Sequence, residues 1–168
     1  EEASEYFRKA LLIDPDYEKA HNNFGKTLRK LGRLDEAAEQ FRNAISIRAD
    51  YAEAHFNLAQ VLTDQGHFDE ALRHYLEAVR LKPDYGAAYD GIGVFYYSKG
   101  RILESISYFE KAISYDPDSA GTYSNLGAVF HESGQRGKAM EYYRKALEIA
   151  PRSDDALSNL GVILLDAG

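Results

Sequence analysis

Four residue patterns recur along this chain with a common spacing of 34 residues. Pro83, Pro117 and Pro151 are 34 residues apart, and Pro15 lies on the same lattice with Ala49 at the intervening node. The same register holds for glycine at 32, 66, 100, 134 and 168, for alanine at 10, 44, 78, 112 and 146, and for an aromatic residue at 7, 41, 75, 109 and 143. A period of this length is typical of stacked supersecondary units that cannot bury an apolar face alone. We therefore expect a functional site to lie on a surface that neighbouring units build together.

One period predicts a pair of helices joined at a glycine. The first half of residues 18–51 has an apolar face at i, i+3, i+4, i+7 spacing, formed by His21, Phe24, Gly25 and Leu28. Gly32 is expected to end this helix, because glycine adopts the left-handed conformation without a Cβ clash. Asp35 is expected to cap a second helix, whose apolar face includes Phe41 and Ala44.

Small residues recur where the two helices of a pair must approach closely. They are Gly25, Ala59, Gly93, Gly127 and Gly161. A leucine at such a position would overpack the contact by about 1–3 kcal/mol. We expect full repeats at residues 18–51, 52–85, 86–119 and 120–153, with a lone second helix at 1–17 and a lone first helix at 154–168. The ragged ends suggest a longer protein with more repeats.

The composition excludes several classes of protein and site. Apolar residues make up 45% of the chain, which is enough for a continuous core. The net charge of −7 argues against nucleic-acid binding, which favours a basic face. The absence of cysteine excludes disulfides and thiolate metal sites, and there is no run of 18 apolar residues to span a membrane. The cellular compartment stays open.

The repeated residues resemble the tetratricopeptide repeat family along the entire chain. Counted from Glu18, the pattern has a bulky residue at repeat position 4, a small residue at 8, alanine at 20 and 27, an aromatic at 24 and proline at 32. The departures are His21, His55 and Leu157 at position 4, Ser105 at position 20 and Ala49 at position 32. The resemblance implies an all-α fold, a right-handed superhelix of antiparallel helix pairs whose first helices line a concave groove.

Asparagine recurs at one of the repeat positions that line this groove in the family. Repeat position 6 holds Asn23, Asn57, Gly91, Asn125 and Asn159. An amide side chain both donates and accepts hydrogen bonds, so a row of amides can bind the main chain of an extended peptide. The row is similar to the asparagine ladder of O-linked N-acetylglucosamine transferases, which implies that role here. The alternative is that a small polar residue simply suits a half-exposed helix.

The other groove positions suggest a charge gradient. Lys19, Lys26, Arg29 and Lys30 make the first end basic, Phe56, Val94 and Tyr97 make the middle partly apolar, and Glu132, Asp155 and Asp166 make the last end acidic. Gln60 and His131 complete the predicted peptide-binding set. A ligand with an acidic stretch and an apolar anchor would be complementary. The alternative is an ordinary solvated face.

Motifs for other chemistry fail on spacing. The carboxylate clamp known in this family requires lysine, asparagine and arginine residues at five defined repeat positions. Only Asn57 fits; the other four positions hold Asn22, Lys26, Ala87 and Gly91. His21 and His55 occupy the core-facing aromatic position, and the remaining histidines are scattered without metal-ligand spacing. The sequence therefore predicts no catalytic residues, no metal and no cofactor.

Two functional hypotheses follow. The first is a non-catalytic scaffold that binds a peptide or a partner protein in the groove. The alternative is a substrate-docking or regulatory region of a larger enzyme, such as a glycosyltransferase. Apolar residues of the lone terminal helices also predict head-to-tail contact between copies. They are Phe7, Leu11 and Ile13 at one end and Leu157, Leu160, Ile163 and Leu164 at the other.

Overall fold

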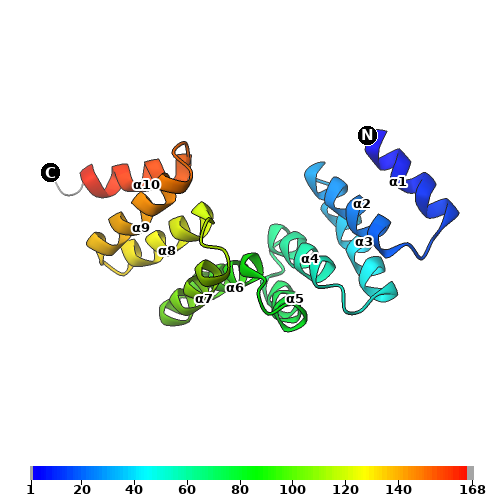
Figure 1. Cartoon of the computed structure of the whole chain (residues 1–168), viewed down its shortest axis with the longest axis horizontal. Coiled ribbons are helices and arrows are strands. Elements are labelled where there is room, and N and C mark those ends of the chain that lie inside the picture. The colour runs from blue at the N-terminus through cyan, green and yellow to red at the C-terminus, as the bar shows by residue number, and fades with distance from the viewer. Residues whose placement is uncertain (1, 166–168) are drawn as a thin grey trace. The chain divides into compact units, whose positions relative to one another are not determined.

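The computed structural model describes residues 2–165, and these form ten α-helices with no strand among them (Figure 1). The all-α class and the helix pairs expected from the 34-residue period are confirmed. Predictions that concern residues 1, 166 and 168, including the acidic role of Asp166, lie outside the described residues.

The chain divides into two compact units, Glu1–Pro83 and Asp84–Gly168. The first contains α1 (Glu2–Ile13), α2 (Glu18–Lys30), α3 (Leu34–Ile47), α4 (Ala52–Asp64) and α5 (Phe68–Leu81). The second contains α6 (Gly86–Ser98), α7 (Ile102–Tyr115), α8 (Ala120–Glu132), α9 (Arg136–Ile149) and α10 (Asp154–Leu165).

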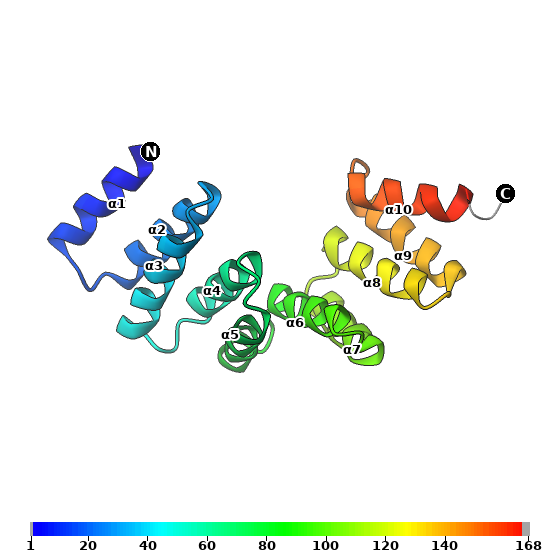
Figure 2. The same cartoon turned by 180° about the vertical axis from the view of Figure 1, so that it is seen from behind.

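Each repeat is a pair of helices packed against each other. The pairs are α2 with α3, α4 with α5, α6 with α7, and α8 with α9, as both views of the molecule show (Figures 1 and 2). Within the first unit α2 also touches α4, and within the second α8 touches both α6 and α10. In each unit, consecutive first helices therefore lie next to each other, which brings equivalent positions of neighbouring repeats together.

Glycine ends the first helix of each full repeat as expected. Gly32, Gly66, Gly100 and Gly134 have φ angles of 73°, 81°, 70° and 73°. In the first of these turns the Arg33 N–H donates to the Leu28 carbonyl at 3.0 Å, which satisfies a carbonyl at the helix end. The expected cap at Asp35 is wrong. α3 begins at Leu34 with Arg33 as the N-cap, and Asp35 instead accepts a hydrogen bond from Gln65 Nε2 at 2.7 Å.

The small residues lie where the sequence pattern predicts close approach. A Cβ added to Gly25 would lie 2.7 Å from the Phe41 ring, and one on Gly93 would lie 2.7 Å from the Phe109 ring. Neither ring can move far, because both are fully buried. A Cβ on Gly161 would meet nothing within 4 Å, since no described helix follows α10.

The terminal helices expose apolar side chains, although not all of those expected. On α1, Leu12 and Ile13 are 83% and 87% exposed, whereas Phe7 is half-buried and stacks on Phe24 with 6.0 Å between ring centroids. On α10, Ile163 is buried in the core of the second unit, so its predicted exposure is wrong. The exposed apolar residues of α10 are Leu157, Val162, Leu164 and Leu165. None of the described helices has the length and apolar character needed to cross a membrane.

Candidate functional site

The surface shared by α2 and α4 brings side chains of neighbouring repeats into contact. Both are first helices, and they touch directly. Hydrogen bonds between them join positions that are 27, 31 or 35 residues apart. The 34-residue period therefore determines which side chains can meet across this surface, which we call the α2–α4 surface.

An amide and carboxylate network crosses the α2–α4 surface. Nδ2 of Asn57 donates to Oδ1 of Asn22 at 2.9 Å, and Nδ2 of Asn22 donates to Oε1 of Glu53 at 3.3 Å. The Lys26 ammonium donates to the same Glu53 oxygen at 3.1 Å. Because Asn57 is only 7% exposed, its amide nitrogen chiefly joins the two repeats. Its carbonyl oxygen accepts no hydrogen bond from any described residue.

Arg29 is held in place by two acceptors on α4. Its Nε donates to Oδ2 of Asp64 at 2.8 Å, and its Nη1 donates to Oε1 of Gln60 at 2.7 Å. An ion pair this exposed contributes little to stability on its own. Its consequence is geometric, because the planar guanidinium is fixed before any ligand arrives.

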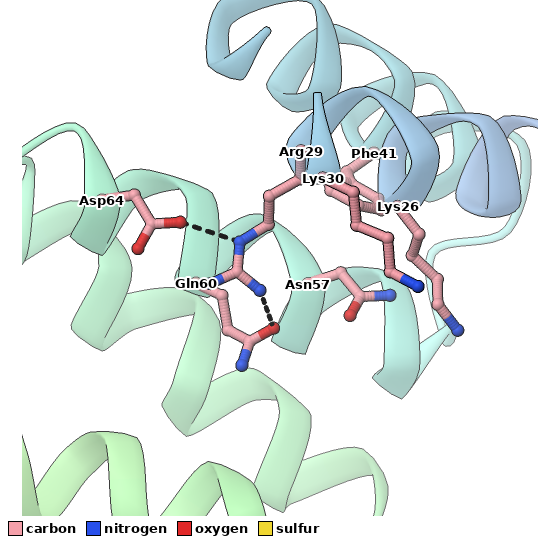
Figure 3. Close-up of a pocket in the computed structure, with 7 residues that line it drawn as sticks. All are labelled: Lys26, Arg29, Lys30, Phe41, Asn57, Gln60 and Asp64. Carbon is pink, nitrogen blue, oxygen red and sulfur yellow. Dashed lines mark hydrogen bonds and ion pairs between the residues drawn. The ribbon is translucent and has the colours of Figure 1, made fainter. Parts of the chain in front are cut away.

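A pocket of about 350 Å³ lies between α2 and α4 (Figure 3). It is lined by Lys26, Arg29, Lys30, Phe41, Asn57, Gln60 and Asp64. Figure 3 shows Lys26 and Lys30 extending beside Asn57, while Arg29 reaches toward Gln60 and Asp64. Six of the seven lining residues carry polar or charged side chains, and the buried ring of Phe41 adds an apolar wall.

Lys30 differs from the other two cations of the pocket. Lys26 and Arg29 each pair with an acid of the neighbouring repeat. Within residues 2–165, Lys30 has neither an ion pair nor a hydrogen-bond partner for its ammonium group, and it is exposed. The lining thus contains three cations and one anion, Asp64, in a protein whose net charge is −7.

The second unit has an equivalent of the asparagine bond, but its acceptor is a carboxylate. Nδ2 of Asn125 on α8 donates to Oδ1 of Asp90 on α6 at 3.1 Å. Burial raises the pKa of Asp90 above its usual value, and hydrogen bonds from Asn125 and Thr122 oppose that rise. The amide nitrogen of Asn125, like that of Asn57, therefore joins two repeats.

The second unit also has an equivalent of the arginine contact. Tyr97 on α6 hydrogen-bonds to the Glu132 carboxylate on α8. Burial, together with this hydrogen bond and the charge of Glu132, raises the pKa of the Tyr97 phenol to about 12. Tyr97 thus remains a neutral donor at physiological pH.

The structure brings five of the predicted site residues together in the pocket. They are Lys26, Arg29, Lys30, Asn57 and Gln60. Asn23 is exposed on α2 outside the pocket lining, and Phe56 is half-buried on α4 with its ring 5.9 Å from that of Tyr75. The remaining predicted residues lie in the second unit. Val94 is exposed there, and the half-buried ones are Tyr97, Asn125, His131 and Asn159.

Sequence reasoning missed the acidic partners that organise the pocket. Asp64 and Glu53 fix Arg29 and Lys26, and neither was in the predicted binding set. A search for complementary side chains separated by about one period would have found them, since Arg29 and Asp64 are 35 residues apart. Phe41 was assigned to packing alone, yet its ring also lines the pocket.

Solved structures with similar folds cover most of the chain. The crystal structure of MamA is 27% identical, with a TM-score of 0.77 over 89% of this chain and 87% of that chain. PilF of Pseudomonas aeruginosa is 22% identical, with a TM-score of 0.82 over 89% of this chain and 68% of that chain. A thermophilic TPR protein of Thermus thermophilus is 22% identical, with a TM-score of 0.80 over 96% and 89% of the two chains. The last two likenesses show the fold alone.

Family models match along nearly the entire chain. Models described as TPR or tetratricopeptide repeats match residues 6–39, 25–66, 52–85 and 84–152, which together leave no gap between residues 6 and 152. A comparison with curated protein sequences gives no match. Repeats of this kind present extended surfaces for other proteins, and the fold indicates a protein-interaction scaffold. The chain belongs to the tetratricopeptide repeat family.

Proposed function

We propose that the chain is a non-catalytic scaffold that binds an extended segment of a partner polypeptide in the groove of its first helices. The α2–α4 surface receives an acidic side chain of that segment in the pocket. The observation that carries this proposal is the combination of an arginine fixed by Asp64 and Gln60 with an unpaired lysine at the same pocket.

The fixed guanidinium favours binding because little freedom remains to be lost. Arg29 already makes two hydrogen bonds, so a ligand carboxylate would meet a donor that does not have to be ordered. Its guanidinium has five N–H groups, of which these bonds use two. A ligand can therefore bind without breaking the contact to Asp64.

Lys30 supplies the charge that the protein itself does not neutralise. Its ammonium extends beside Asn57 at the pocket (Figure 3). The carbonyl oxygen of Asn57 is available to accept a peptide N–H, so a side-chain carboxylate and the adjoining main chain have complementary partners. A pocket of about 350 Å³ has the size of sites that hold a small ligand or a few side chains.

The test compares acidic peptides with their amide counterparts. A library of fluorescein-labelled octapeptides, each with one Asp or Glu and a twin with Asn or Gln at that place, is titrated with the protein by fluorescence anisotropy. We expect a subset of acidic peptides to bind at least about ten-fold more tightly than their twins, as one charge-assisted hydrogen bond would produce. Equal binding by the twins in every pair would contradict the acidic requirement.

A matched pair of protein variants locates the site. Lys30→Gln should remove most of the preference for the acidic peptide, because it deletes the unpaired charge of the pocket. Lys19→Gln is the control, since Lys19 is also exposed and unpaired on α2 within the described residues but does not line the pocket. Equal loss in both variants would indicate a diffuse charge effect instead of a site.

The asparagine row gives only weak support to the alternative function, a substrate-docking region of a larger enzyme. The resemblance to glycosyltransferases implies that the row holds a peptide main chain through the NH₂ and carbonyl groups of each amide. Here the amide nitrogens of Asn57 and Asn125 donate to Asn22 and Asp90. Of the four asparagines in the row, all within the described residues, Asn23 and Asn159 are the two whose side chains make no such bond. A scaffold role that does not depend on an attached catalytic domain therefore accounts better for this surface.

A further inference from the structure

Two histidines join α4 to α5 through their rings. Nδ1 of His55 and Nδ1 of His74 are 3.0 Å apart, and the ring centroids are 5.2 Å apart. His55 is only 7% exposed, so water cannot easily replace this contact. The proposed scaffold function makes no use of this histidine pair, which sequence analysis assigned to packing and scattered positions.

The hydrogen bonds determine where the protons lie. Nε2 of His55 lies 3.2 Å from the Ala49 carbonyl oxygen, and a carbonyl can only accept, so Nε2 carries the proton. Nδ1 of neutral His55 is then the acceptor, and Nδ1 of His74 must be the donor. Both rings are neutral in this arrangement, and Nε2 of His74 holds the free lone pair.

Protonation of both rings is incompatible with this geometry. If each ring were charged, both Nδ1 atoms would carry hydrogen and would face each other at 3.0 Å. The hydrogen bond would be replaced by a contact between two donors on two cations. A single added proton can reside on Nε2 of His74 without breaking the bond, so the second proton is the one that separates the rings.

The surroundings also resist the first proton. Burial lowers the pKa of His74, a positive charge on His55 would lower it further, and the charges of Arg42 on α3 and Arg73 on α5 add to the effect. Glu70 on α5 opposes these effects, although it also pairs with Arg42 at 3.3 Å.

Glu77 on α5 is the other acid near the pair. The hydrogen bond from Arg80 and the positive charge of Arg80 lower the pKa of Glu77. Positive charges on His55 and His74 would lower it to a lesser extent. Since Glu77 is engaged by Arg80, its charge only partly compensates a protonated histidine pair.

We propose that the His55–His74 pair is a pH-sensitive contact that holds α4 against α5 when neutral and releases it on acidification. The same α4 contributes Asn57, Gln60 and Asp64 to the pocket. Release of α4 would therefore weaken acidic-peptide binding, a consequence that rests on the proposed function. The opening itself does not depend on any ligand.

The direction follows from proton linkage. In the unfolded or opened repeat His74 takes up a proton at its ordinary pKa near 6.5, whereas in the closed repeat it does so only at lower pH, because burial lowers its pKa. The contribution of the pair is fully present above pH 6.5 and is lost as the pH falls below that value. The opening equilibrium constant should rise by up to about ten-fold per pH unit for each proton taken up.

The first repeat provides a matched control within the chain. There Gln40 occupies the place of His74, and Nδ1 of His21 lies 2.8 Å from Oε1 of Gln40. Nε2 of His21 lies 2.9 Å from the Pro15 carbonyl, as Nε2 of His55 does from Ala49. His74→Gln therefore converts the second repeat to the arrangement of the first, and Gln40→His does the reverse.

Hydrogen–deuterium exchange of the amides tests the opening at pH 7.5, 6.5, 5.5 and 5.0, corrected for the intrinsic exchange rate at each pH. Carboxylates remain mostly ionised over this range. In the wild type, α4 and α5 should lose protection on acidification more than α2 and α3. His74→Gln should remove the excess, and Gln40→His should create a similar loss in α2 and α3. An unchanged acid response in His74→Gln would overturn the proposal. If that variant does not fold, an unchanged response in Gln40→His would overturn it as well.

Anisotropy with the labelled acidic octapeptide at the same pH values tests the consequence. The affinity should fall more steeply with acidification in the wild type than in His74→Gln. A loss of amide protection in α4 and α5 on acidification, together with an unchanged peptide affinity, would overturn the link between the histidine pair and the pocket. Acid-induced exchange in a protein that binds no peptide at pH 7.5 would leave the pH-sensitive contact standing and remove the proposed function instead.

Discussion

Equivalent positions on neighbouring first helices form an ion pair in the first unit and a neutral hydrogen bond in the second. Arg29 of α2 meets Asp64 of α4, whereas Tyr97 of α6 meets Glu132 of α8, and each pair is 35 residues apart. The guanidinium has N–H groups beyond the two that bind Asp64 and Gln60, whereas the phenol donates its single O–H to the carboxylate. Under the proposed function, the first unit would bind an anion at this position and the second would not.

A similar difference separates the contacts inside the repeats. Residues 19 apart meet within each helix pair, and in the first unit they are hydrogen-bonded polar pairs, His21 with Gln40 and His55 with His74. In the second unit they are stacked tyrosines, Tyr89 with Tyr108 and Tyr123 with Tyr142. The first unit thus has imidazole rings at places where the second has phenols. Burial raises the pKa of three of these four phenols, Tyr89, Tyr108 and Tyr142.

The comparison separates what the period determines from what the side chains determine. Helix length, turn glycines and residue spacing decide which positions touch, and they are the same in both units. Charge, and with it ligand preference and response to pH, depends on the residues at those positions. Each unit can therefore serve as the control for the other.

The largest effect should come from removing the asparagines that join the repeats. Asn125→Ala leaves the half-buried Asp90 carboxylate without one of its two hydrogen-bond donors, at a cost of about 1.5–3 kcal/mol. Asn57→Ala leaves a neutral acceptor, Asn22, and should cost about 1 kcal/mol. Urea unfolding measures both, with Asn23→Ala as the control because Asn23 is exposed. Equal stability of Asn125→Ala and Asn23→Ala would show that the bond contributes nothing.

An exchange of charge between the units should change peptide binding by about ten-fold, or about 1.4 kcal/mol. Lys30 of the first unit corresponds to Ser98 of the second, two periods later. Lys30→Ser should lose the acidic preference without a change in urea midpoint, because Lys30 has no partner among the described residues. Ser98→Lys should gain weaker acidic binding, since Tyr97 offers no spare donor there. Anisotropy titrations measure both, and a Lys30→Ser variant with full acidic preference would contradict the assignment of the site.

The 34-residue spacing predicted the helix pairs, their glycine turns and the close approach of two helices at Gly25, which the structure places against Phe41. These features follow from local rules, since a left-handed turn or a missing Cβ leaves a signature at one position. The predicted binding set also included Arg29 and Gln60, which both line the pocket between α2 and α4.

The polar partners were harder to predict because they depend on how one helix lies against another, either between repeats or within one. Nothing in the sequence of a single helix indicates that Asn57 donates to Asn22 or that His55 meets His74. The first depends on the offset between α2 and α4, and the second on the offset between α4 and α5. Complementary residues 35 or 19 positions apart are the signal that would reveal such contacts in other repeats of this kind.

A smaller effect should appear in the pH dependence of stability. The pKa of Asp90 is raised in the folded state, so its contribution is fully present below the unfolded value of about 3.8 and is lost as the pH rises through the folded value. Asp90→Asn should therefore be more stable than the wild type at neutral pH, by about 1.4 kcal/mol for each unit of pKa shift. Urea unfolding between pH 3.5 and 7.5 measures this. The reverse change, Asn22→Asp, should destabilise the first unit as the pH rises, because Glu53 lies beside it. Parallel pH curves for wild type and Asp90→Asn would refute the account of Asp90.

The smallest effect concerns the first and last described helices, α1 and α10, one in each unit. We propose weak association between copies, because α1 exposes Leu12 and Ile13 while α10 exposes Leu164 and Leu165. Contact between α1 of one copy and α10 of the next would cover both apolar strips, and such a heterologous contact need not close. Light scattering from about 0.05 to 1 mM protein should then show a rising average mass, and Leu12→Asp/Ile13→Asp should suppress the rise. A mass that stays monomeric over this range would exclude the contact, whereas an equal rise in the variant would move it to another surface of the units.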